Sequence, residues 1–103
     1  GYLCDTHTAV AVNVYGQYVK ATGDNRPVVI ASTASPYKFA DSVLSALTDE
    51  KAENDFDKVR QLSRLTSTEI PEPIKALENA EIRFNDVCEK DEMLSAVYSA
   101  LKI

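Results

Sequence analysis

Apolar residues recur at helical spacing in several stretches of the chain. The first stretch covers about residues 6–21, where Val10 and Val14 lie four positions apart and would share one face of a helix. Asp5 can cap its start with a side-chain oxygen, and Gly23 suits its end. Because further apolar residues flank this stripe, we expect the helix to be well buried.

The same spacing predicts further helices nearer the carboxyl terminus. They cover about residues 36–47, 55–65 and 89–101, with a single helical turn at about 74–77. Pro36 suits the first turn of its helix, where the missing N–H is not needed. Asn54 is a good capping residue for the helix that follows it. We expect the apolar stripe of each helix to face inward.

Two other segments are predicted to be extended. Residues 28–32 contain a continuous β-branched run, which is typical of a strand covered on both faces. Residues 82–87 indicate a weaker edge strand. Together with the helices, these strands predict a helix-rich α/β fold. A buried strand needs neighbours on both edges, so we expect the missing strands to come from an upstream part of a larger protein or from a second copy, through self-association.

Composition limits the function more than it defines it. A chain of 103 residues forms one small domain, and its start at Gly1 is expected of a single fragment, residues 1–103, of something larger. The net charge of −5 argues against nucleic acid, and no apolar run is long enough to span a membrane. Cys4 and Cys88 lie outside any CxxC pattern, which suits reduced thiols in a cytoplasmic protein. With one histidine, we predict no metal site.

Candidate chemistry gathers after the predicted strand 28–32. Ser32, Thr33 and Ser35 stand between that strand and the next helix, a position where α/β proteins bind ligands. From spacing alone, simple capping by Ser35 is the favoured interpretation. Lys38 is more typical of a solvated or anion-facing lysine than of one that forms a Schiff base.

His7 lies in the first turn of the opening helix. Two interpretations of it remain open. It could bind an anion or gate a pocket, or it could be a partly exposed side chain without a role.

Two blocks of the sequence carry a resemblance to a known family. Residues 1–11, GYLCDTHTAVA, and residues 29–39, VIASTASPYKF, resemble two successive segments of threonine synthases, the second often written TAHPAKF in that family. The match is close over residues 1–47 and looser over residues 67–103. The chain departs from the family pattern at Ser35, where many members have histidine.

The resemblance implies the carboxy-terminal portion of a fold-type II pyridoxal-phosphate enzyme with a tryptophan synthase β-like architecture. The implied parent enzyme converts O-phospho-L-homoserine and water to L-threonine and phosphate. Its Schiff-base lysine and glycine-rich phosphate loop would lie upstream, so the chain is expected to hold no catalytic residue, to bind no cofactor alone and to be inactive by itself. Thr33 matches the family threonine that meets the pyridine nitrogen of pyridoxal phosphate.

Two other functions are compatible with these patterns. The chain could be part of another fold-type II enzyme, such as a dehydratase, although the block from Thr33 to Phe39 argues against it. It could also be a stand-alone α/β interaction module that shares only a structural unit with the enzymes.

Overall fold

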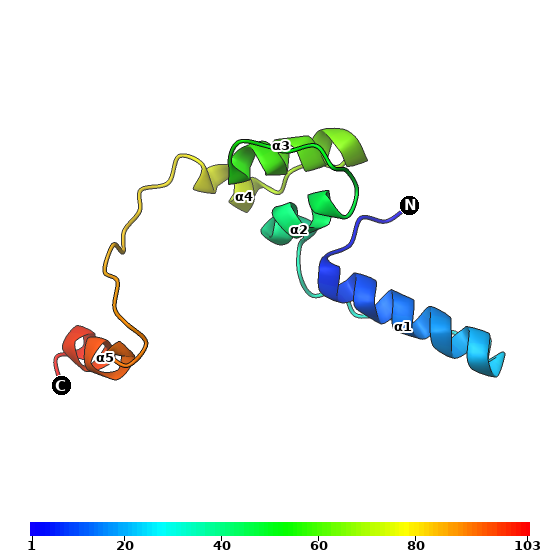
Figure 1. Ribbon diagram of the computed structural model, residues 1–103, viewed down its shortest axis with the longest axis horizontal. Helices are drawn as coiled ribbons and strands as arrows, with labels where there is room; N and C mark the ends of the chain where they lie inside the picture. Colours follow the sequence, from blue (N-terminus) through cyan, green and yellow to red (C-terminus); the bar gives the residue numbers. More distant parts are fainter.

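The computed structural model describes all of residues 1–103 (Figure 1). Its elements in chain order are α1 Thr6–Thr22, the 3-10 helix η1 Pro36–Phe39, α2 Ala40–Ser45, α3 Asp55–Thr66, α4 Glu72–Leu77 and α5 Met93–Leu101. Helix accounts for 52% of the chain and there is no strand, so the fold is all-α. Every helical segment predicted from the sequence is present, although the last begins at Met93 rather than near residue 89.

The core lies where α2 and η1 pack against α3. Leu62 on α3 is completely inaccessible to solvent. The other buried apolar residues of this cluster are Tyr37, Ala40, Val43, Leu44 and Val59. The Tyr37 hydroxyl donates to the carbonyl oxygen of Thr68 at 3.0 Å, and Lys58 pairs with Asp41 at 2.9 Å. These polar contacts align η1 and α2 with α3 around the apolar cluster.

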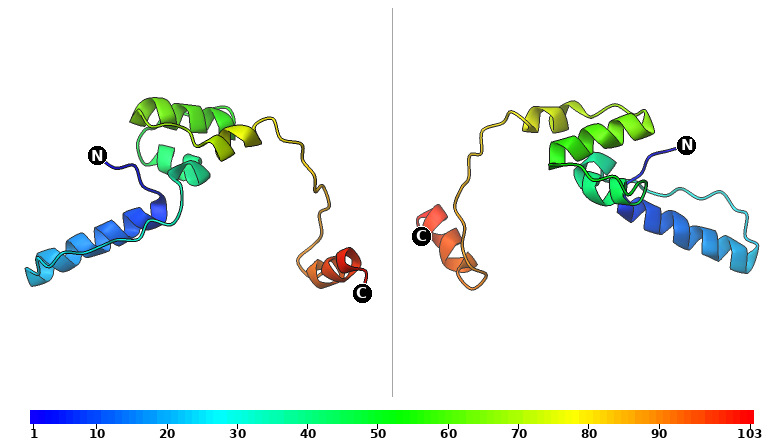
Figure 2. Two further views of the ribbon diagram at one scale, coloured as in Figure 1. Left: turned by 180° about the vertical axis from the view of Figure 1, so that it is seen from behind. Right: turned by 45° about the horizontal axis from the view of Figure 1, so that its top comes forward.

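Helix α1 begins and ends as its sequence predicts, but it is not buried. Asp5 accepts a hydrogen bond from the backbone of His7 at the start, and Gly23 adopts a left-handed conformation, φ 69°, at the end, which glycine does without a steric cost. Val10 is nevertheless 63% exposed and Val14 57% exposed. The expected burial is therefore wrong for this chain, because no other element packs against most of the helix (Figure 2).

The predicted buried strand at residues 28–32 is wrong. This segment has no regular structure, and Val29 is 96% exposed. It belongs to a stretch that runs back along α1, held by contacts such as Tyr18 Oη to Asp24 at 2.9 Å (Figure 2). An extended segment becomes a strand only when a neighbour pairs with its N–H and C=O groups, and this chain supplies no such neighbour.

The predicted edge strand at residues 82–87 is also wrong, and with it the α/β fold class. The segment is an irregular connection in which Phe84 is 83% exposed. The fold-type II architecture expected from the resemblance does not appear in the helical chain. Figure 1 shows α5 at the far end of this connection, away from the other helices. Every residue from 75 to 103 is exposed, so the predicted inward face of α5 meets no core.

The overall shape is extended. The radius of gyration is 19.2 Å, whereas about 13 Å is usual for a compact domain of this length. No helix is both long enough and apolar enough to cross a membrane. Only the region around α2 and α3 has the packing of a folded core.

Truncating Leu62 tests that core. Leu62→Ala should lower the free energy of unfolding by about 2–5 kcal/mol, because it removes fully buried methyl groups and leaves a cavity. Leu65→Ala is the matched control on the same helix: Leu65 is 52% exposed, and its loss should cost less than about 1 kcal/mol. Urea unfolding followed by circular dichroism measures both, and equal losses would contradict the assignment of the core.

Candidate functional site

The most organised polar cluster lies where the start of α1 meets the segment before η1. Asp5 caps α1, and its side chain is only 1% exposed. Thr8, in the first turn of the helix, is buried as well. Ser32 reaches this cluster from 24 positions further along the chain. The cluster therefore joins the first block of the family resemblance to the second.

Both carboxylate oxygens of Asp5 accept hydrogen bonds. Oδ1 accepts from the backbone N–H of His7 at 2.9 Å and lies 3.0 Å from Nδ1 of the same residue. Oδ2 accepts from the hydroxyl of Thr8 at 2.5 Å. These donors stabilise the ionised carboxylate, and the Thr8 hydroxyl contributes most. Together they lower the pKa of Asp5 from 3.8 to about 2.

The hydroxyl of Thr8 also contacts the hydroxyl of Ser32. The oxygens of the two hydroxyls lie 3.0 Å apart. A hydroxyl has a single proton to donate, and the Thr8 hydroxyl donates its hydrogen bond to the strong acceptor Asp5. The hydroxyl of Ser32 must then donate to Thr8. The hydrogen bonds therefore all run in one direction, from Ser32 to Thr8 and from Thr8 to Asp5.

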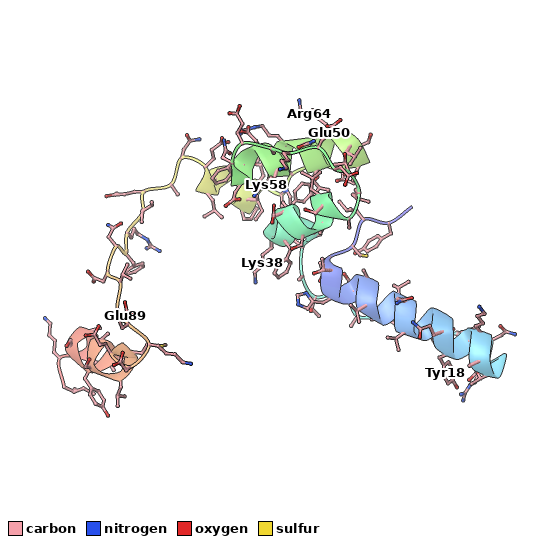
Figure 3. The ribbon with its side chains drawn as sticks, in the orientation of Figure 1. Tyr18, Lys38, Glu50, Lys58, Arg64 and Glu89 are labelled. Atoms are coloured by element: carbon pink, nitrogen blue, oxygen red, sulfur yellow. The ribbon has the colours of Figure 1, made fainter.

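The other residues singled out from the sequence lie close to this cluster along the chain. Thr33 follows Ser32 directly and is exposed, and it is Ser32 and not Thr33 that bonds to Thr8. Ser35 accepts from the backbone N–H of Tyr37 at 3.3 Å, so its predicted capping role is confirmed. Lys38 is exposed, as expected of a solvated lysine, with Nζ 5.6 Å from the ring centre of Phe39 (Figure 3).

His7 combines exposure with two fixed contacts. Its side chain is 75% exposed. One side of the ring contacts Asp5, and the ring also meets Phe39 edge-on, with the centroids 5.2 Å apart and the planes at 60°. The sequence placed His7 correctly in the first helical turn, but its contact with Phe39 depends on how η1 packs beside α1.

The sequence predicted Asp5 only as a helix cap and did not reveal the cluster that Asp5 organises. The local part was recognisable, because an aspartate at the cap followed by donors two and three residues later can satisfy both carboxylate oxygens. The contact with Ser32 had no comparable signal. It joins residues that only the path of the chain after α1 brings together.

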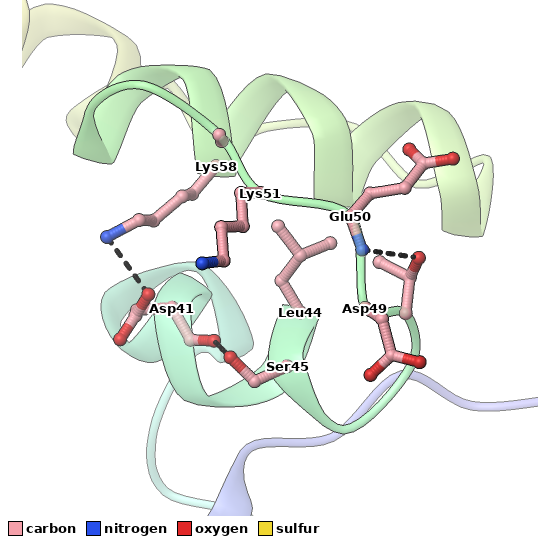
Figure 4. A pocket seen from close by; sticks show the side chains of 9 residues that line it. Asp41, Leu44, Ser45, Asp49, Glu50, Lys51 and Lys58 are labelled. Atoms are coloured by element: carbon pink, nitrogen blue, oxygen red, sulfur yellow. Dashed lines mark hydrogen bonds and ion pairs between the residues drawn. The ribbon is translucent and has the colours of Figure 1, made fainter.

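A second polar site is a hollow of about 420 Å³ beside α2 and α3. Figure 4 shows Lys51 and Lys58 directed toward Asp41, with Asp49 and Glu50 on the opposite side. Lys58 is already paired with Asp41 and Asp55, so its charge is balanced within the chain. No group of three or more potential metal ligands occurs in the protein. The hollow offers less organised chemistry than the cluster around Asp5.

Comparison with known families defines the class of protein. Residues 8–98 match the family described as threonine synthase, C-terminal. The match covers most of the chain, including Thr8, Ser32 and Thr33, and the chain belongs to this family. A comparison with individual curated proteins gave no match. The resemblance seen in the sequence is therefore confirmed at the level of the family.

The lowered pKa of Asp5 predicts an acid-sensitive structure. Because the folded value of about 2 lies below the unfolded value of 3.8, the ionised carboxylate stabilises the fold fully above about pH 5, and this contribution is lost as the pH falls toward 2. Unfolding curves measured between pH 2 and 5 should show this loss. Asp5→Asn keeps a capping side chain and should flatten the dependence.

Asp24 provides a control for this experiment. Its pKa is also lowered to about 2, chiefly by the guanidinium of Arg26, whose side chain is 81% exposed. Added salt should weaken this exposed ion pair, whereas hydrogen bonds from neutral donors to buried Asp5 should resist it. An Asp5→Asn variant with the same pH dependence as the unmodified chain would contradict the role given to Asp5.

Proposed function

We propose that this chain is the carboxy-terminal part of a threonine synthase, a lyase that converts O-phospho-L-homoserine and water to L-threonine and phosphate. The observation that carries the proposal is the family match over residues 8–98. It favours this function over a dehydratase and over a stand-alone interaction module. The parent enzyme would work in the cytoplasm, in keeping with two unpaired cysteines.

The proposed cofactor is pyridoxal phosphate, which supplies an electron sink for the reacting carbon atoms when bound. Thr33 suits one edge of this group. Its side chain is exposed and its hydroxyl has no partner in the chain, so it is free to meet the pyridine nitrogen. A neutral hydroxyl there suits a ring nitrogen that is not fully protonated, in contrast to a carboxylate.

The remaining cofactor contacts are proposed to come from the preceding part of the enzyme. The three glycines, Gly1, Gly16 and Gly23, are scattered and form no phosphate-binding loop of the kind that needs close backbone approach. The lysine that holds the cofactor is likewise assigned to that part. The role of this chain is then to position Thr33 and to complete the walls of the site.

The large accessible surface of the chain is evidence for a large partner. Its accessible area is 8760 Å², whereas a compact monomer of this mass would expose about 5,700 Å². The excess of roughly 3,000 Å² is greater than the share that one partner buries in a typical obligate interface, about 1,000–2,500 Å². Such an excess is better explained by a core shared with the rest of one enzyme than by a dimer of this chain.

The composition of the exposed helices is further evidence that the rest of the enzyme covers this chain. Lys20 is the only lysine, arginine, aspartate or glutamate in α1, and α5 has none of these residues. Helices with so few charged residues and with a wide apolar face normally pack against other protein. We assign the covering surface to the upstream part of the same enzyme, and self-association of the isolated chain would be a consequence of leaving that surface bare.

The isolated chain should neither retain pyridoxal phosphate nor make threonine. The reason is the proposed division of the site, in which the cofactor-holding lysine lies elsewhere. The test is to incubate the chain with the cofactor, reduce with borohydride, and map any modified lysine by mass spectrometry. Scattered partial labelling is expected, and stoichiometric labelling of one specific lysine would contradict the proposal.

Replacing Thr33 tests its contact with the cofactor in the intact enzyme. Thr33→Val keeps the shape but removes the hydroxyl, a loss of about 1–3 kcal/mol in a buried site. If the contact is stronger in the transition state, turnover measured by phosphate release should fall roughly ten- to a hundredfold. Ser35→Ala is the control and should mainly weaken a helix cap, by about 1 kcal/mol of stability. Full activity of Thr33→Val would remove this residue from the cofactor site.

A further inference from the structure

The ring of His7 is held more firmly than its exposure would suggest. Nδ1 lies 3.0 Å from Oδ1 of Asp5, and the ring meets Phe39 edge-on, although the side chain is 75% exposed. Fixing a surface side chain costs conformational entropy. Here two separate elements, the cap of α1 and the end of η1, contribute to holding one imidazole.

Asp5 determines which ring nitrogen carries the proton. Hydrogen bonds, chiefly from Thr8, keep the carboxylate ionised with a pKa of about 2, so near neutral pH it can only accept hydrogen bonds. The nitrogen facing it, Nδ1 of His7, must therefore be the donor. Nε2 then carries the lone pair in the neutral ring, and it is the atom that gains or loses a proton.

The same hydrogen bonds connect His7 to the proposed cofactor contact. Asp5 accepts from Thr8, Thr8 lies 3.0 Å from Ser32, and Ser32 is followed directly by Thr33. This series of hydrogen bonds, buried at Asp5–Thr8 and part-buried at His7 and at Ser32, fixes the imidazole and the segment before Thr33 relative to each other. Capping α1 requires only the bond to the backbone of His7, so the contacts to the ring and to Ser32 need another explanation.

We propose that Asp5 is a positioning residue that holds His7 in the Nδ1–H form, so that Nε2 accepts a proton from a water molecule or hydroxyl group of the ligand bound beside Thr33. The proton that Nε2 takes produces an imidazolium, whose charge Asp5 balances, and Nε2 later returns it. The proton transfer at Nε2 rests on the proposed function. The position of the ring proton on Nδ1 does not depend on it.

The tautomer can be measured directly on the 103-residue chain, because His7 is its only histidine. Nitrogen NMR of the imidazole, recorded at a pH where titration shows the ring to be neutral, should find the proton on Nδ1. Asp5→Ser retains a side chain that caps helices as well as aspartate does but removes the carboxylate. In this variant the preference for Nδ1–H should be lost, while circular dichroism shows that α1 persists.

Asp24→Ser is the matched control for the tautomer experiment. Asp24 is another carboxylate with a lowered pKa, but it lies beyond the far end of α1 and contacts Arg26 instead of His7. The variant should leave the imidazole signals unchanged. A proton on Nε2 in the unmodified chain, or an unchanged tautomer in Asp5→Ser, would overturn the proposal.

Activity measurements on the intact enzyme show whether Asp5 acts by positioning His7 or independently of it. If Asp5 acts through His7, Asp5→Ser and His7→Ala should each lower kcat about tenfold or more, with a smaller change in KM. The double variant should be no slower than His7→Ala alone. Losses that multiply would overturn the role through His7. An unmodified enzyme that releases no phosphate from O-phosphohomoserine would instead contradict the proposed function and leave the tautomer result standing.

Discussion

The packing of α2 against α3 is the constraint on which the rest of the structure depends. It removes Leu62 completely from solvent and surrounds it with the chain's few other buried apolar side chains. Tyr37 extends this core to η1, and its hydroxyl ties η1 to the loop after α3. The position of η1 then sets the position of Phe39, against which His7 lies. The candidate site is thus anchored to the only well-packed region of the molecule.

A polar network links the start of α1 to the segment before η1. Asp5 is the second largest fully buried side chain after Leu62, and it is tolerated because both of its oxygens are satisfied by donors. Each member of such a network must be accurately placed, because loss of one donor would leave the buried carboxylate without compensation for its desolvation. A network of this kind specifies orientation better than apolar contacts do. The proposed site would require such precise orientation, since it would place an imidazole and a hydroxyl near one ligand.

Most of the apolar surface lies outside this core. Both α1 and α5 expose large apolar side chains, and the chain exposes much more surface than a compact protein of its mass. For a member of the threonine synthase C-terminal family, this surface is accounted for by the proposed remainder of the enzyme. Under this proposal the functional site and the uncovered helices would have one explanation, because the same remainder of the enzyme would complete both.

The sequence by itself determined the helices, their caps and the family, whereas the tertiary structure decided what is buried. Asp5, Asn54 and Ser35 were predicted as caps and act as caps, because a cap depends on the few residues beside it. Residues 28–32 have the composition of a buried strand but form none, because strand formation and burial depend on partners distant in sequence. For the same reason, the hydroxyls around Thr33 could be located from the sequence, but the link from Ser32 through Thr8 to Asp5 appeared only once the chain had folded back along α1.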